Sequence, residues 1–451
     1  MAKIAFYTLG CKVNQADTAS MENLFLRSGH QLVSFDGEAD VYIINTCVVT
    51  NTGQRKSRQT IHRAIRKNPN ALIVVTGCYP QTAAEEVKSI AGVDMIIGNQ
   101  DRAQIVQLVE ERLAHRQTDT LDAVHKLTAS TAFEEMAAGD ITDKTRAFLK
   151  IQEGCNQFCT YCIIPYARGP LRSRSLESIR TETQRLISAG FKEIVLIGIH
   201  LGCYGKENPD GPTLYDAVKT VLDVPGVQRL RLGSLESVEV EPRLLTLMQE
   251  DARFCRHLHL PLQSGCDKTL QAMHRPYTTA KFKTLLADIK TKVPDIAITT
   301  DVIVGFPGET EADFETTCKF AESCGFSKMH IFPFSARKGT PAEKFAGAVT
   351  EAVKKERADI LGKIDETMHK TFLQAMVGQN AEVLFEQPAG EDYFEGLTGN
   401  YQRVFVNCGG KNLGGEILPV KITAFDGEKL LGEIIISYQL NTTLNSEEVK
   451  I

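Results

Sequence analysis

Apolar strand-like runs alternate with amphipathic helical stretches along the first hundred residues. The strand-like runs are KIAFYTL, VYIINT and LIVVTG, with DMIIG as a candidate fourth. Helical stretches over 17–27 and 55–67 separate the first three. Short β-branched strands separated by helices predict a parallel sheet that is covered on both faces.

A second region of alternating strands and helices begins near residue 147. Strands are expected at 147–151, 193–199, 228–234, 257–262, 297–305 and 328–334. Helices are expected at 176–189, 213–223, 241–250, 279–292 and 311–323. Six β/α repeats in about 190 residues are too few for a closed eight-unit barrel of roughly 250 residues. A partial (β/α)6 barrel is therefore predicted.

The last third of the chain changes pattern twice. Residues 350–376 are rich in Lys, Glu, Ala and Leu, which predicts one long bridging helix. The runs AEVLFE, RVFVN, EILPVKITAF and LLGEIIISY, broken by glycine-rich turns, then predict a small all-β barrel. The resulting organisation is α/β. It has an N-terminal domain (1–114), a linker (115–145), the partial barrel (146–349), the bridging helix (350–376), the β module (377–440) and a frayed polar tail (441–451).

Composition narrows the class of protein. The chain has 451 residues, 43% hydrophobic and 24% charged, with a formal net charge of −5. These values exclude collagen-like and wholly disordered chains. No apolar stretch approaches the roughly 18 residues of a membrane span, and the first residues run directly into a strand pattern, so we expect a cytoplasmic protein. Because the overall charge is negative, a nucleic-acid site would have to be a local basic patch.

Cysteine is the most informative residue type here. Twelve cysteines in a reducing compartment suggest metal, cluster or thiolate chemistry rather than disulfides. Cys155, Cys159 and Cys162 form a C-x3-C-x2-C loop directly after the first strand of the second region. Three such thiolates can hold three corners of a [4Fe–4S] cluster and leave the fourth iron open. Zinc is the alternative, although a closed structural zinc site would need a fourth ligand.

A second group of cysteines is recognised by position. Cys11, Cys47 and Cys78 each directly follow a predicted strand of the first region. The carboxyl ends of parallel strands share one crevice, so these residues are expected to converge on a second cluster. Each alone could instead be a small buried hydrophobe, which is what we expect of the six cysteines without ligand spacing: Cys203, Cys255, Cys266, Cys318, Cys324 and Cys408.

Together these segments resemble the methylthiotransferases of the radical S-adenosylmethionine (SAM) superfamily over nearly the whole chain. The matching stretches are TLGCKVNQADT, INTCVVT, TGCYP, EGCNQFCTYCIIPYARGPLRSR, HLPLQSGCDKTLQAMHRPYT, DVIVGFPGET and FPFSARKGTPA. The last module is similar to a TRAM domain, the RNA-contacting unit of the family. The TLGCKVNQ opening is similar to the MtaB group, whereas the MiaB group reads closer to GCQMN and the RimO group closer to GCPKN.

The resemblance implies a reaction and its cofactors. The MtaB group adds a methylthio group to C2 of N6-threonylcarbamoyladenosine beside the tRNA anticodon, using two [4Fe–4S] clusters and two SAM molecules. An auxiliary cluster on the first three cysteines would carry the sulfur, and the C-x3-C-x2-C cluster would cleave SAM to a radical. A cofactor is needed because an unactivated aromatic C–H bond has no acid–base route. An electron donor such as flavodoxin or ferredoxin is expected. No catalytic residue is expected beyond the cluster ligands.

SAM contacts are expected at the carboxyl-end rim of the barrel. The resemblance places Tyr161 beside the adenine. Position alone suggests six further SAM contacts: Ser234, Glu236, Gln263, Ser264, Phe332 and Phe334. For each of them, a role in supporting the residues that touch SAM is an equal alternative. His200 also follows a strand, but we expect it to be hydrogen-bonded structure.

Two basic clusters are candidate tRNA contacts. Arg55 and Arg58 lie after Cys47 in a basic run that contains no acidic residue. A solvated helix face is an equal explanation for this run. Arg168, Arg172 and Arg174 form the second cluster and follow the cysteine loop. Residues 376–440, by contrast, hold four basic and nine acidic residues. This net negative charge opposes binding to the phosphate backbone of RNA. This keeps open a RimO-type enzyme that modifies an aspartate of a ribosomal protein. MiaB-type chemistry on isopentenyladenosine, and an iron–sulfur carrier or RNA-binding module without radical chemistry, are further alternatives.

Overall fold

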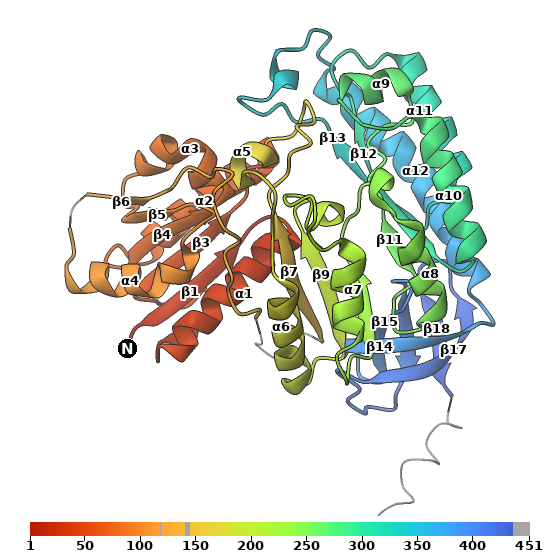
Figure 1. Cartoon of the computed structure of the whole chain (residues 1–451), viewed down its shortest axis with the longest axis horizontal. Coiled ribbons are helices and arrows are strands. Elements are labelled where there is room, and N and C mark those ends of the chain that lie inside the picture. The colour runs from red at the N-terminus through yellow and green to blue at the C-terminus, as the bar shows by residue number, and fades with distance from the viewer. Residues whose placement is uncertain (118, 140–144, 436–451) are drawn as a thin grey trace, which may run out of the picture.

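The N-terminal region is a six-stranded parallel sheet. The structure, a computed structural model, describes residues 1–117, 119–139 and 145–435, so the predicted tail over 441–451 lies outside the described residues. The strand order is β2-β1-β3-β4-β5-β6 (Figure 1). The strands are β1 (Lys3–Thr8), β2 (Gln31–Val33), β3 (Val41–Thr46), β4 (Leu72–Gly77), β5 (Met95–Ile97) and β6 (Leu121–Ala123).

Helices cover both faces of this sheet, as its apolar strands predict. Apolar side chains of α1 (Lys12–Arg27) and α4 (Ile105–Ala114) pack on one face, and those of α2 (Asn51–Lys67) and α3 (Cys78–Lys88) on the other. Every residue of β3 and β4 is consequently buried. The short strands β2 and β6 were not predicted, because three half-exposed residues leave little hydrophobic signal, and β6 belongs to the segment that the sequence suggests is a linker.

Six parallel strands form the central partial barrel. They are β7 (Arg146–Glu153), β9 (Glu193–Gly198), β10 (Arg229–Leu232), β11 (His257–His259), β12 (Ala297–Val304) and β13 (Lys328–Pro333). Hydrogen-bonded ladders join β7, β9 and β10, and likewise β11, β12 and β13. Parallel bridges between residues 230 and 254 and between 234 and 259 connect the two groups, and β8 (Arg172–Ser173) adds an antiparallel edge to β7. The predicted six-unit partial barrel is confirmed.

The five helices expected in the central region are present, and two short helices, at 164–168 and 267–272, were not predicted. In chain order they are α5 (Ile164–Arg168), α6 (Leu176–Ser188), α7 (Leu214–Leu222), α8 (Pro242–Glu250), α9 (Asp267–Ala272), α10 (Thr279–Lys292) and α11 (Glu311–Cys324). The helices α7 and α11 begin with capping boxes, at Thr213 and Thr310. Among the residues that the structure describes, no helix is both long and apolar enough to cross a membrane.

A closed five-stranded barrel follows the central region, and α12 (Glu351–Ala375) connects the two. Its strands are β14 (Asn380–Pro388), β15 (Tyr393–Thr398), β16 (Arg403–Asn407), β17 (Ile417–Phe425) and β18 (Leu430–Ile434). The barrel docks where the central strands begin: Arg146 at the start of β7 pairs with Glu386, and Arg229 at the start of β10 donates to the carbonyl of Glu382. It therefore lies at the opposite end of these strands from the cysteine loop that follows β7 (Figure 1).

Candidate functional site: two cysteine trios

Three cysteines lie at one edge of the N-terminal sheet. Cys11 and Cys47 follow β1 and β3 closely, and Cys78 follows β4 as the first residue of α3. These three strands are neighbours in the sheet. The approach is close: a Cβ atom at Gly10, next to Cys11, would lie 3.1 Å from Cys47 Sγ, and Gly10 has φ of +105°. The predicted convergence of strand-end cysteines is therefore present.

The surroundings of this first trio suit a bound cluster. The Nε–H of Arg168 lies 3.3 Å from Cys78 Sγ, so a cationic donor faces one thiolate position. Burial raises the pKa of the Cys47 thiol to about 11. A thiol of this kind is protonated near neutral pH, and a metal must displace its proton on binding.

The second trio lies on the loop that follows β7. The loop is held by backbone hydrogen bonds from Cys155 N–H to the carbonyl of Gly169, at 3.0 Å, and from Thr160 N–H to the carbonyl of Met273, at 3.1 Å. Gly154 begins it with φ of +78°, and a Cβ there would lie 1.9 Å from the carbonyl oxygen of Pro170. Only glycine fits at this position.

Nitrogen donors also face the sulfurs of the second trio. Arg275 Nη1 lies 3.2 Å from Cys159 Sγ, and His200 Nδ1 lies 3.3 Å from Cys155 Sγ. Burial raises the pKa of Cys162 to about 12. Sulfur donors grouped in threes, with N–H groups directed at them, fit the ligand set and outer hydrogen bonds of [4Fe–4S] clusters.

A buried ion network joins the two cysteine trios. Arg168 is fully buried, and its Nη1 lies 3.1 Å from both Asp17 of α1 and Glu153 of β7. Arg102 and Lys150 each lie 2.5 Å from the Asp17 carboxylate. Although burial favours the neutral acid, these cations hold the pKa of Asp17 and of Glu153 below their usual range.

This network corrects the expectation for the arginines that follow the cysteine loop. Arg168, Arg172 and Arg174 are 0%, 4% and 3% exposed and cannot reach a phosphate in this conformation. Arg172 donates to the carbonyls of Pro170 and Arg168, and Arg174 donates to the carbonyl of Met136. They hold the loop and the domain junction, because a buried guanidinium must find acceptors inside the protein.

The predicted SAM-contact residues have different environments. Tyr161 is half-buried against Met273, Phe306 and Phe334, so an aromatic wall forms beside the second trio. Glu236 pairs with Arg275 and thereby joins the hydrogen bonds around Cys159.

The remaining five predicted SAM contacts differ in their exposure to solvent. Ser234 is exposed, Gln263 is half-buried, and Phe332 is 46% exposed while the nearby Phe334 is buried. Ser264 is a correction: it is 0% exposed and its hydroxyl bonds Thr317 and the backbone of Cys266, so it supports the loop rather than facing a cofactor.

The α2 cluster remains a tRNA-contact prediction. Arg55 is exposed, whereas Arg58 lies 3.1 Å from Glu86 and 3.3 Å from the hydroxyl of Tyr79. Arg55 is therefore the freer of the two to meet a phosphate.

Comparison with known proteins agrees with this architecture. Residues 3–98 match uncharacterized protein family UPF0004, and residues 149–321 match the radical SAM superfamily. The chain is 42% identical to "Threonylcarbamoyladenosine tRNA methylthiotransferase MtaB" of Bacillus subtilis, over 94% of each chain. It is 40% identical to the protein of that name from Aquifex aeolicus, over 85% of this chain and 92% of that one.

The chain belongs to the methylthiotransferase family of radical SAM enzymes.

Other members and solved structures extend the comparison. A "tRNA-2-methylthio-N(6)-dimethylallyladenosine synthase" of Moorella thermoacetica is 34% identical over 95% of this chain and 97% of that protein. The radical SAM methyltransferase TsrM of Kitasatospora setae shares the fold with a TM-score of 0.58 at 11% identity, over 82% of this chain and 89% of that one. Membership of the radical SAM superfamily brings a [4Fe–4S] cluster and SAM with it.

Two residues beside the second cysteine trio were not predicted, Arg275 and Glu239. Arg275 lies in the HRPY stretch, which carries no ligand pattern. His200 was assigned to hydrogen-bonded structure, and it does bond Cys155 and Glu239, the latter at 2.8 Å. Burial opposes its charged form, but hydrogen bonds with Cys155, Cys203 and Glu239 raise its pKa overall.

Proposed function

We propose that the protein transfers a methylthio group to C2 of N6-threonylcarbamoyladenosine beside the anticodon of tRNA. The observation that carries this proposal is the 36–42% identity, over at least 85% of this chain, to three relatives named for that substrate. The grouping of six cysteines into two trios supports the same chemistry.

In this proposal Cys11, Cys47 and Cys78 hold an auxiliary [4Fe–4S] cluster, and Cys155, Cys159 and Cys162 hold the radical SAM cluster. When bound, the two clusters and two SAM molecules supply the adenine-activating radical and the methylated sulfur. The protein's own side chains hold these groups in place and direct N–H donors at the cluster sulfurs. Tyr161, Ser234, Glu236, Gln263, Phe332 and Phe334 remain the proposed SAM contacts.

The tRNA is proposed to reach the site through a groove of about 530 Å³ beside the second trio. Phe158 and Tyr166 lie in its wall, are 49% and 48% exposed, and meet edge to face at 5.8 Å. Exposed rings of this kind stack on splayed-out bases of single-stranded RNA loops. Lys126 of the same groove and Arg55 of α2 would contact phosphates.

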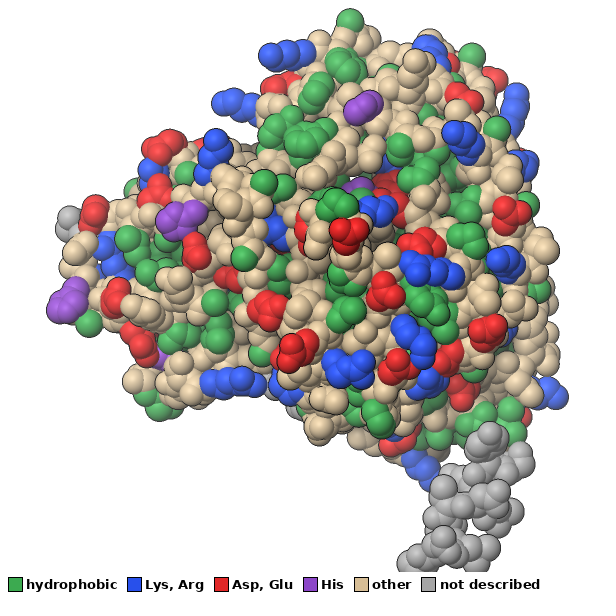
Figure 2. All heavy atoms as spheres, viewed as in Figure 1, with side chains coloured by type: hydrophobic (Ala, Val, Ile, Leu, Met, Phe, Trp, Pro, Cys, Tyr) green, Lys and Arg blue, Asp and Glu red, His purple; other side chains and the backbone are tan. Residues whose placement is uncertain are grey.

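Electrostatics favour a local contact rather than a broad basic face. Acidic and basic side chains are interspersed over the face seen in Figure 2. The acidic β-barrel lies away from the cysteine loop, so we propose that it touches the tRNA at a distance from the reacting base. The reaction is proposed to take place in the cytoplasm, with flavodoxin or ferredoxin as reductant.

The test is nucleoside mass spectrometry of tRNA from cells with and without the gene. Selective loss of 2-methylthio-N6-threonylcarbamoyladenosine is expected, with restoration by the wild-type chain and by Cys408→Ser but not by Cys78→Ser. Cys408 is a suitable control because it directly follows β16 in the distant barrel.

The relatives named for dimethylallyladenosine, at 33–34% identity, make that nucleoside the second candidate. Loss of 2-methylthio-N6-dimethylallyladenosine alone would select it. Unchanged tRNA nucleosides would reject both and direct the search to ribosomal proteins.

A further inference from the structure

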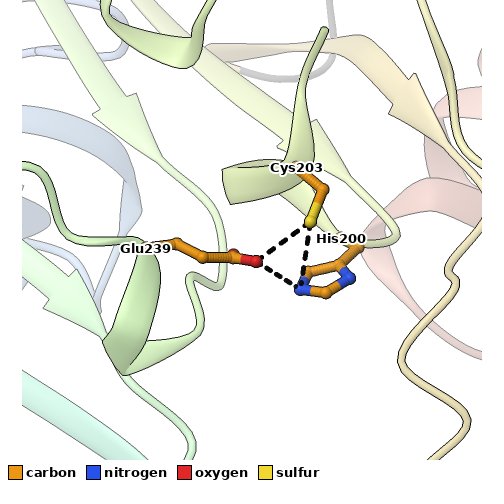
Figure 3. Close-up of side chains that lie close together, drawn as sticks. All are labelled: His200, Cys203 and Glu239. Atoms are coloured by element: carbon orange, nitrogen blue, oxygen red, sulfur yellow. Dashed lines mark hydrogen bonds and ion pairs between the residues drawn. The ribbon is translucent and has the colours of Figure 1, made fainter. Parts of the chain in front are cut away.

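Three side chains with metal-binding atoms converge beside the second cysteine trio. His200 and Cys203 follow β9, Glu239 follows β10, and their ligand atoms all lie within 4.8 Å of one another. Glu239 Oε1 is 2.8 Å from His200 Nε2 and 3.0 Å from Cys203 Sγ, and that sulfur is 3.7 Å from the same nitrogen. Figure 3 shows the three side chains pointing toward a common centre.

The carboxylate of this cluster has an unused oxygen. Glu239 is 8% exposed, and its Oε2 has no hydrogen-bond partner among the described residues. A Cβ at Gly202 would lie 2.2 Å from Oε2, so a glycine makes room for the carboxylate. A buried acceptor without a partner is costly, and a cation bound through both oxygens of this carboxylate would satisfy it.

We propose that His200, Cys203 and Glu239 bind one divalent transition-metal ion, with Zn²⁺ the best match. Imidazole nitrogen, thiolate sulfur and carboxylate oxygen are all zinc ligands, and three protein ligands leave a fourth position for water or a substrate atom. Binding releases the Cys203 thiol proton and the Nε2 proton of His200 to solvent.

The remaining contacts of these residues are compatible with a metal. His200 Nδ1 stays hydrogen-bonded to Cys155 Sγ, at 3.3 Å, while Nε2 turns its lone pair to the ion. A ligating histidine commonly donates its other N–H in this way, which fixes the tautomer. Lys206 Nζ is 3.8 Å from Glu239 Oε1, and the Lys206 side chain is 52% exposed, so it can move aside.

The rival explanation is a hydrogen-bonded chain from Glu239 through His200 to Cys155 that never binds metal. Zinc content and zinc coordination separate the two. The full-length protein is purified anaerobically, reconstituted with iron and sulfide, and titrated with Zn²⁺ against a chelating dye. Zinc and iron are then counted by mass spectrometry, and the zinc K-edge spectrum is recorded.

We expect one zinc per chain in addition to the cluster iron, coordinated by one sulfur and by nitrogen and oxygen. Cys203→Ser and Glu239→Gln should each weaken zinc binding at least tenfold at unchanged iron content, whereas Cys408→Ser should not. Absence of bound zinc, equal affinity in wild type and both variants, or a three-sulfur spectrum from zinc in a cluster trio would each overturn the proposal. The spectrum of the wild-type chain decides the matter even if a variant fails to fold.

Discussion

Replacing Arg168 by methionine tests whether the buried ion network holds the two cysteine-bearing domains together. Methionine keeps much of the side-chain volume but removes the charge that faces Asp17, Glu153 and the sulfur of Cys78. The loss leaves two buried carboxylates with fewer cations nearby.

The expected cost follows from the contacts that remain. Removing one partner of a buried ion pair costs about 3–5 kcal/mol. Arg102 and Lys150 still contact Asp17 in the variant, so we expect the lower end, about 3 kcal/mol of unfolding free energy. Arg168→Lys keeps the charge but loses the forked donor, so its unfolding free energy should lie between those of Arg168→Met and the wild type.

Urea unfolding followed by far-ultraviolet circular dichroism measures this cost, since the chain has no tryptophan to report it. The matched control is Arg58→Met, because the Arg58–Glu86 pair is 39% and 48% exposed. An exposed pair contributes about 0–1 kcal/mol.

Acidification supplies the second readout. The pKa values of Asp17 and Glu153 are lowered in the folded protein, so their contribution to stability is present above their unfolded pKa values, about 4, and is lost as pH falls. Arg168 is one cause of that lowering, so the gap between wild type and variant should shrink below pH of about 4. A loss no larger than that of Arg58→Met, or a gap that is the same at neutral and acidic pH, would refute the reasoning.

Three further outcomes are expected. Cys162→Ala should reduce bound iron after reconstitution from about eight to about four per chain, because one cubane cluster loses a ligand; a variant that keeps about eight irons contradicts this. In the metal-free protein, iodoacetamide should alkylate Cys47, whose pKa is about 11, on the order of 100-fold more slowly at pH 8 than an ordinary thiol of pKa about 8.5. The rate should rise with pH up to about 11 by peptide mass spectrometry, and a rate equal to that of a free thiol would argue against the burial effect. Phe158→Ala should weaken tRNA binding about 5- to 150-fold in a filter-binding assay, since base stacking contributes about 1–3 kcal/mol; Phe158→Tyr keeps the ring and should bind normally, and unchanged affinity in the alanine variant would reject the stacking surface.

Local patterns explain why much of the architecture could be predicted. The apolar runs at β3 and β4 are buried throughout, so their hydrophobicity marks both the strands and the covered sheet. Cysteines that directly follow such strands meet at one edge through the geometry of a parallel sheet alone, and a C-x3-C-x2-C loop brings its sulfurs together over a few residues.

Residues that act through distant partners could not be assigned in the same way. The arginines of RGPLRSR suggest a phosphate-binding patch in the sequence, but Arg168 is enclosed by Asp17 and Glu153, which lie 151 and 15 positions away. A guanidinium binds a phosphate or a carboxylate equally well, so only its burial decides between them.

The order of residues along the chain was thus sufficient for the longer strands and helices and for the two cysteine trios, because each depends on periodicity or on position relative to a strand end. Only the tertiary structure could show which charges are buried, that Arg275 and His200 face cysteines of the loop after β7, and that Glu239 meets His200 and Cys203. These contacts join the ends of different strands, and their energies depend on exclusion from water, which is a property of the folded chain and not of any local segment.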